Sequence, residues 1–164
     1  MKSSNIAQSG IIIALTLAIL YSTSLLPIST LSILTLASCL IPIAIIRTSL
    51  KSTLLIYVAS SILSFFLVPI NISVLYALFF GIYGIIKFFI EKLNNLILEI
   101  ILKLLSFNLL LFIIYTIFKA FLGFKIQFSL LIFIGAAQIG FLIYDYALTL
   151  IISYFYNKIN KRLF

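Results

Sequence analysis

Long apolar segments alternate with short interruptions of charged residues, proline or glycine along almost the whole chain. A transmembrane helix needs about 20 mainly apolar residues, because it rises about 1.5 Å per residue through a hydrocarbon core of about 30 Å. The pattern therefore predicts an all-α, polytopic membrane protein whose six transmembrane helices form a single domain over residues 1–164. The predicted spans cover about residues 6–26, 31–46, 52–68, 72–90, 100–121 and 128–156.

Proline or basic residues mark the ends of several predicted spans. Pro27 follows the first span, Arg47 the second and Pro69 the third. Pro42, inside the second span, predicts a kink that frees a backbone carbonyl for a neighbouring helix. No ten-residue alternating pattern indicates a barrel, and an open sheet in lipid would leave backbone groups unpaired, so helices are the expected spanning elements.

The composition excludes a water-soluble domain. Hydrophobic residues make up 65% of the 164 positions and charged residues only 9%, against about 25% charged in a typical soluble domain. The expected solvent is therefore the lipid bilayer. The first span could be mistaken for a signal peptide, but the five spans after it indicate a retained helix.

The basic residues are distributed unevenly between the two sides of this topology. Positive charge collects in short cytoplasmic loops, so the distribution predicts that both termini are cytoplasmic in a bacterial cell membrane. The net charge of +8 is then explained by topology and anionic lipids, without nucleic acid. The expected cytoplasmic residues are Lys2, Arg47, Lys51, Lys87, Lys92, Lys103, Lys158, Lys161 and Arg162, and the expected outer ones are Lys119 and Lys125.

Two pairs of opposite charge lie between the fourth and fifth spans. Lys87 and Glu91 are four residues apart, as are Glu99 and Lys103, so each pair shares one helix face. One interpretation is an interfacial helical turn at headgroup level, and the other is a docking edge for a cytoplasmic partner. Because exposed ion pairs contribute little, the first is preferred.

Small residues form a stripe along the first span. Gly10, Ala14 and Ala18 recur at four-residue spacing, which lets another helix approach closely in lipid. The stripe predicts either packing within the bundle, the preferred interpretation, or an interface with a helix of another subunit. Ala136 and Gly140 in the last span form a shorter version, expected to serve internal packing.

This organisation resembles the substrate-binding S component of energy-coupling factor transporters. The features that carry the resemblance are the first-helix stripe, six short helices and both termini inside. In that family an Ala-x-x-x-Ala pattern contacts the transmembrane coupling subunit, which works with ATPases, and the matching positions here are Gly10, Ala14 and Ala18. The resemblance departs in two places. The family's outer loop after the first helix is only "PIST" here, and the histidine needed by metal-uptake variants is missing.

The middle of the chain is also similar to the YybS-like bacterial membrane proteins. The shared features are an apolar run through Pro42 that ends at Arg47, a Leu-Lys turn, and the pair Gly81 and Gly84. These proteins have an S-component-like organisation, so this likeness favours the same multi-helix architecture.

Polar residues at depth are the candidates for ligand recognition. Asp145, the only aspartate, lies about 16 Å from the expected inner end of the last span, near the midplane. An aspartate there costs about 2.5–3.5 kcal/mol and usually marks a ligand or proton pathway. Gln138 shares its helix face, Asn108 in the fifth span is expected beside it, and Tyr144 or Tyr146 can share its site.

Two roles for Asp145 stay open. It faces a ligand or carries a proton, or it accepts hydrogen bonds that lock the last two helices together. An interhelical hydrogen bond contributes about 0.6 kcal/mol, less than the cost of inserting an ionised acid. The sequence offers no obvious cation within reach, because Arg47, Lys51 and Lys119 are expected near the membrane surfaces.

Catalytic and metal chemistry find no support in the residues. The chain has one aspartate, two glutamates and no histidine, which speaks against an aspartyl, serine or metal-dependent enzyme. The single Cys39 offers neither a disulfide nor a metal site, and no P-loop is present. The chain is therefore expected to be no enzyme and to bind neither a metal nor another cofactor.

The sequence predicts a substrate-capture subunit that depends on partner subunits for energy. An unknown small molecule, largely apolar or aromatic, is expected to enter from the outer side among the last three spans. Asp145, Gln138, Asn108 and Tyr144 are the expected recognition residues. The alternative is a membrane scaffold or assembly protein with no small-molecule ligand.

Overall fold

The computed structural model describes residues 3–25, 29–121 and 130–160, and within them every regular element is helical. The fourth predicted span is built from three consecutive elements, of which the middle one is a π-helix. The elements are α1 (Ser3–Leu25), α2 (Thr30–Arg47), α3 (Leu50–Leu67), α4 (Ile70–Leu75), η1 (Tyr76–Phe80), α5 (Gly81–Glu91), α6 (Leu96–Phe121) and α7 (Leu130–Asn160).

Six helices in the described part of the chain are long and apolar enough to cross a membrane. The predicted all-α architecture with six candidate spans is therefore confirmed. The helix ends lie within a few residues of the predicted ones, and the treatment of residues 1–164 as one domain stays a prediction. Lys2, Pro27, Lys125, Lys161 and Arg162 fall outside the described residues.

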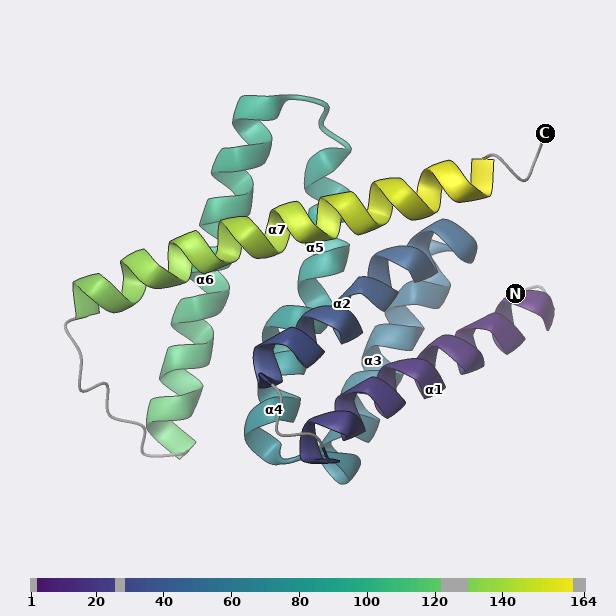
Figure 1. The fold of residues 1–164 in the computed structure, drawn as a ribbon, viewed down its shortest axis with the longest axis horizontal. Coiled ribbons are helices and arrows are strands. Elements are labelled where there is room, and N and C mark those ends of the chain that lie inside the picture. Colours follow the sequence, from purple (N-terminus) through teal and green to yellow (C-terminus); the bar gives the residue numbers. More distant parts are fainter. Residues whose placement is uncertain (1–2, 26–28, 122–129, 161–164) are drawn as a thin grey trace.

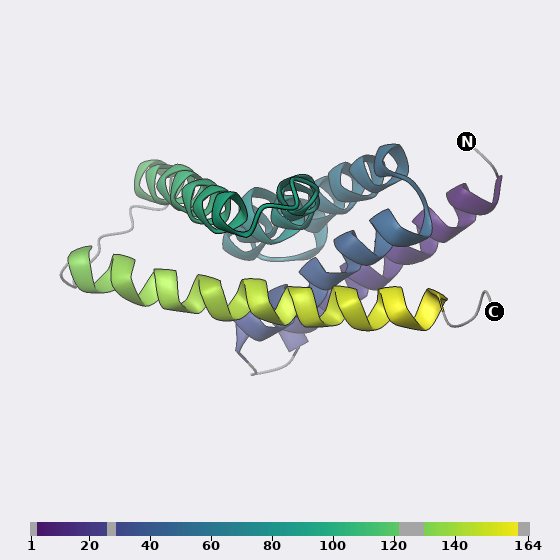
Figure 2. The same cartoon turned by 90° about the horizontal axis from the view of Figure 1, so that it is seen from above.

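The helices run back and forth between two ends of the bundle (Figure 1). The start of α1 and the end of α7 lie at the same end, together with the connections α2–α3 and α5–α6. The connection α3–α4 lies at the opposite end. Viewed from above, α7 covers one face of the layer that contains α5 and α6, and it crosses them obliquely (Figure 2).

The helix α3 turns small polar residues towards the bundle and large apolar residues outward. Ser60 and Ser64 are fully buried, whereas Leu55 is 57% exposed and Phe66 is 82% exposed. A water-soluble helix shows the reverse arrangement, because apolar surface is driven out of water. In lipid, small residues allow close helix packing and large apolar side chains face the acyl chains. The packing therefore agrees with a multi-pass membrane protein.

Hydrogen bonds join α3 to the π-helical part of the fourth span. The Tyr57 hydroxyl donates to the carbonyl of Ala77 at 2.7 Å, and the hydroxyls of Ser60 and Tyr76 lie 2.9 Å apart. A π-helix disturbs the regular i→i−4 pattern, and short π segments occur often at functional sites. These hydroxyls hold the irregular segment in place, which matters because Phe79 and Phe80 belong to it.

Two glycines allow α5 to approach its neighbours closely. A Cβ at Gly84 would lie 2.9 Å from Cδ of Pro42, and a Cβ at Gly81 would lie 2.9 Å from the Tyr57 ring. Pro42 is buried inside α2, which continues through it to Arg47. The Gly81 and Gly84 pair thus has a packing role that places α5 against α2 and α3.

The small-residue stripe of α1 faces away from the bundle. Ile12, Thr16 and Leu20 form the buried face of α1, whereas Gly10, Ala14 and Ala18 are exposed, and no atom lies within 4 Å of a Cβ built at Gly10. The preferred interpretation, packing within the bundle, was wrong. The two sets of residues occupy different faces of the helix, and Ile12 and Leu20 of the buried set belong to hydrophobic core clusters that also contain residues of α2.

Candidate functional site

Four charged side chains from three helices form a compact cluster. Lys87 Nζ lies 2.5 Å from Asp145 Oδ1 and 2.8 Å from Glu91 Oε1. Lys103 Nζ lies 2.9 Å from Glu91 Oε1 and 3.1 Å from Asp145 Oδ2. Each lysine therefore contacts both carboxylates, and the cluster joins α5, α6 and α7. The two positive and two negative charges sum to zero.

Two hydroxyl groups complete the charged cluster. The Tyr83 hydroxyl donates to Asp145 Oδ1 at 2.7 Å, and Lys87 Nζ donates to the Thr149 hydroxyl at 2.8 Å. Burial is greatest at Lys87, whose side chain is 0% exposed, and least at Glu91, at 32%. The cluster thus opens to the surface at Glu91 and is closed at Lys87.

The expectation that no cation reaches Asp145 was wrong. Lys87 and Lys103 were assigned to the membrane surface from their positions near helix ends, but both point into the bundle. A sequence signal was available, because Tyr83, Lys87 and Glu91 follow one another at four-residue spacing and so form a polar stripe along one face of a span.

The depth expected for Asp145 also assumed an upright helix. Its partner Lys87 lies about one turn, or about 6 Å along the axis of α5, from the end of that helix at Glu91. The ion pair therefore holds Asp145 at about the same distance from that end. The helix α7 crosses the bundle obliquely (Figure 1), so distance along α7 exceeds depth. Asp145 therefore lies closer to the end that carries the termini than an upright helix would place it.

Only one of the two predicted i,i+4 ion pairs forms. Lys87 pairs with Glu91, whereas Lys103 pairs with Glu91 and Asp145, and no ion pair joins it to Glu99 within the described residues. Lys87 and Lys103 are thus not exposed surface residues as expected, because their side chains lie between helices. The position of the turn at headgroup level stays a prediction.

An aromatic cluster lies directly beside the charged one. The Tyr83 ring packs against Phe141 at 5.2 Å and Tyr144 at 5.5 Å between centroids. Phe79 lies 5.8 Å from Tyr83, and Phe107 stacks on Phe141 at 4.4 Å. Tyr83 belongs to both clusters, because its ring contacts the aromatic side chains while its hydroxyl binds Asp145.

On the far side of the aromatic cluster is an apolar pocket of about 580 Å³. This volume is in the range of small-molecule sites. The walls come from the start of α2, from α4 and η1, and from α6 and α7. The lining includes the rings of Phe79, Phe80, Phe107, Phe141 and Tyr144, the small residues Ala136, Ala137, Gly140 and Ala147, and the hydroxyls of Ser32 and Thr35.

The predicted recognition residues fall into different environments. Tyr144 lines the pocket, whereas Asp145, Gln138 and Asn108 are not among its lining residues. Asn108 does not lie beside Asp145 as expected: its side-chain oxygen accepts a hydrogen bond from Gln138 at 2.8 Å. Tyr83 takes the place expected for a neighbouring tyrosine of α7. Contact of these residues with a ligand stays a prediction.

The short pair Ala136 and Gly140 does not serve internal packing as expected. Both residues line the pocket, and no atom lies within 4 Å of a Cβ built at Gly140. The small side chains therefore leave space between α7 and its neighbours.

No family model, curated protein sequence or solved structure matches the chain. The class is therefore defined by the structure, as a multi-pass membrane protein with six candidate spanning helices. Its distinguishing features are a cluster of four charges between α5, α6 and α7, fully buried at Lys87, and an adjoining apolar pocket.

Proposed function

We propose that the protein is the substrate-binding subunit of a small-molecule uptake transporter in a bacterial cytoplasmic membrane. The observation that carries the proposal is the pocket of about 580 Å³ among α2, α4–η1, α6 and α7. Three of the four walls come from the spans among which ligand entry was expected. A concave, mainly apolar space of this size is typical of small-molecule sites, so it favours a ligand site.

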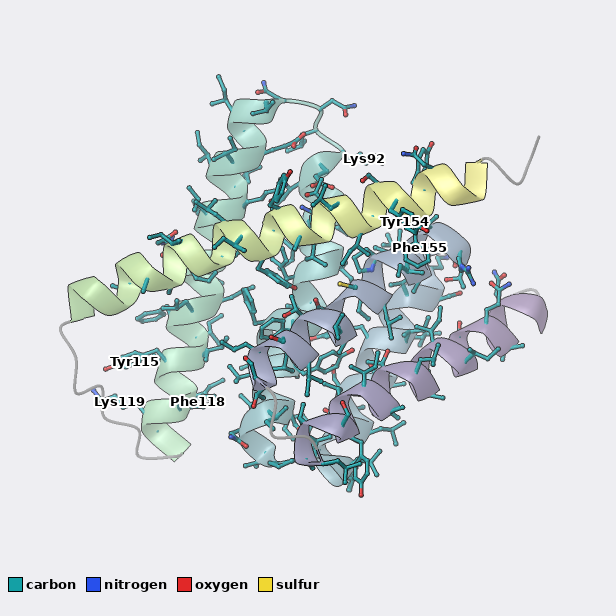
Figure 3. The ribbon with its side chains drawn as sticks, in the orientation of Figure 1. Lys92, Tyr115, Phe118, Lys119, Tyr154 and Phe155 are labelled. Atoms are coloured by element: carbon teal, nitrogen blue, oxygen red, sulfur yellow. The ribbon has the colours of Figure 1, made fainter. Side chains whose placement is uncertain are left out.

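The position of the pocket supports uptake from outside. It is lined by the start of α2 and mainly by the first half of α7. Arg47, Lys51 and Lys92 instead lie at the connections α2–α3 and α5–α6, at the end that holds the termini. Lys92 and Lys119 lie at opposite ends of the bundle (Figure 3). If the end rich in basic residues is cytoplasmic, the pocket lies in the outer half.

The exposed stripe of α1 supports a partner helix. Gly10, Ala14 and Ala18 face away from the bundle, and small residues are the usual sites of close helix approach in lipid. In the proposed function this face binds the transmembrane coupling subunit, and the associated ATPases supply the energy that the chain itself does not.

Two experiments test the proposal. The first is a thermal-shift screen of the purified protein against vitamins, amino acids, nucleobases and apolar aromatic compounds, in which at least one class is expected to raise the unfolding temperature. If no compound stabilises the protein, the result favours the alternative, a membrane scaffold that binds helices only.

The second experiment concerns the partner. The tagged protein is purified from its native membrane, and the coupling subunit and ATPases are expected to co-purify with it. Ala14→Leu is expected to remove them, because the larger side chain prevents close helix approach. Ala120→Leu is the matched control, since Ala120 is an exposed small residue on another helix. Co-purification that survives Ala14→Leu would exclude this face as the interface.

A further inference from the structure

The route into the pocket follows from the way α6 and α7 meet. These helices are joined at a crossing by the Lys103–Asp145 ion pair, the stacked rings of Phe107 and Phe141, and the Asn108–Gln138 hydrogen bond. Beyond this crossing, Leu111 and Ile114 of α6 and Ala136 and Ala137 of α7 line the pocket. The two helices therefore stand on either side of the pocket beyond their crossing.

The lateral side of the pocket faces the bilayer. Ile143 lines the pocket and is 65% exposed, and Ala136 and Gly140 are exposed beside it. In a six-span bundle this lateral surface is in contact with acyl chains. An apolar molecule dissolved in the membrane can reach the pocket without crossing a polar layer.

The lining defines the chemistry of the occupant. Among the residues that the structure describes, no charged side chain lines the pocket, and the nearby charges are already paired with one another in the charged cluster. An ionised ligand would be buried without a partner, at high cost in free energy. The ligand is therefore uncharged.

Aromatic rings dominate the side of the pocket nearest Tyr83. Five rings, from η1, α6 and α7, line it, and Phe107 and Phe141 already stack at a centroid distance of 4.4 Å. Aromatic pairs contribute about 0.5–1.5 kcal/mol beyond area burial, an advantage that a saturated chain does not obtain. The walls therefore favour a planar aromatic molecule over an acyl chain.

From these observations we infer that the pocket binds an uncharged, planar aromatic molecule that enters sideways from the bilayer between α6 and α7. This inference rests on the proposed function, because it names the substrate class and the route for the same pocket. It does not depend on the coupling subunit.

Photolabelling of the protein in phosphatidylcholine nanodiscs tests the inference. Three probes carry a diazirine: a naphthalene, a decane, and a phosphatidylcholine labelled in its acyl chain. Labelled residues are identified by mass spectrometry. The naphthalene probe is expected to label lining residues of α6 and α7, and excess unlabelled naphthalene is expected to compete.

Gly140→Leu fills the pocket and is expected to reduce naphthalene labelling at least about five-fold, equivalent to about 1 kcal/mol of binding free energy. Gly135→Leu is the matched control, because Gly135 is on the same helix, has open space around it and does not line the pocket. Thermal unfolding checks that both variants fold, and Ala137→Leu is the second filling variant.

Failure of this inference and failure of the proposed function give different results. If the labelled phospholipid or the decane probe reaches the lining residues and naphthalene does not compete, the occupant is aliphatic and the inference is overturned while the pocket remains a binding site. Equal loss of labelling in the Gly140 and Gly135 variants also overturns it. If no probe labels the lining residues above the rest of α6 and α7, the proposed function fails as well.

Discussion

At the scale of single residues, Lys87 has the most demanding environment in the described structure. Its ammonium group has three donors, and three side-chain acceptors surround it, on Asp145, Glu91 and Thr149. A fully buried lysine with an unpaired donor would be strongly unfavourable. The complete set of acceptors explains how this charge is tolerated inside an apolar bundle.

Asp145→Leu is expected to destabilise the protein by about 3–5 kcal/mol, because it leaves two lysines with a single carboxylate between them. Asp145→Asn is expected to cost clearly less, since the amide oxygen still accepts hydrogen bonds from Lys87 and Tyr83. Thermal or denaturant unfolding in detergent measures both.

The double variant Lys87→Met with Asp145→Leu is the control for that prediction. It removes one charge of each sign and leaves the Lys103–Glu91 pair, so it is expected to be more stable than Asp145→Leu alone. Equal stability of Asp145→Asn and Asp145→Leu would contradict the ion-pair account of this residue.

At the scale of the elements, close contact between α2 and α5 rests on one glycine. The Pro42 ring is rigid, so a Cβ at Gly84, 2.9 Å from its Cδ, forces the helices apart. Gly84→Ala is expected to destabilise the fold by about 1–3 kcal/mol. Gly135→Ala is the matched control with open space, and there alanine's higher helix propensity gives a neutral or slightly favourable effect in unfolding measurements.

The helices themselves were largely predictable from sequence, and one of their irregularities was not. Apolar length and the positions of Pro69 and Arg47 gave spans close to α2 and α3. The π-helix at Tyr76–Phe80 has no comparable signature, because a change in hydrogen-bond pattern leaves the composition of a span unaltered.

At the scale of the whole molecule, the arrangement of the helices determines which residues of the site could be predicted from the sequence. Asp145 was recognised from its chemistry, but its partners depend on the inclination of α7 (Figure 1), which linear counting does not contain. The lining of the pocket could not be predicted for the same reason, because the pocket forms between helices that are distant in sequence. Of the predicted recognition residues, only Tyr144 lines it.

The proposed orientation can be tested with single cysteines. Cys39 is buried, so the native protein is the unlabelled control. Asn71→Cys and Lys92→Cys are exposed and lie near opposite ends of the fourth span. A membrane-impermeant maleimide is expected to label Asn71→Cys in intact cells and Lys92→Cys only after permeabilisation. The reverse pattern would invert the proposed topology.

The π-helix at Tyr76–Phe80 fixes the rotational phase of the second half of the fourth span. Its i→i+5 bonds accommodate one residue more than an α-helical turn, and each residue of an α-helix corresponds to about 100° of rotation. Deleting one residue here would let the span become continuous α-helix and would turn Tyr83, Lys87 and Glu91 away from Asp145 together. A single irregular turn at the pocket thus aligns the charged side chains two to three turns further along the span.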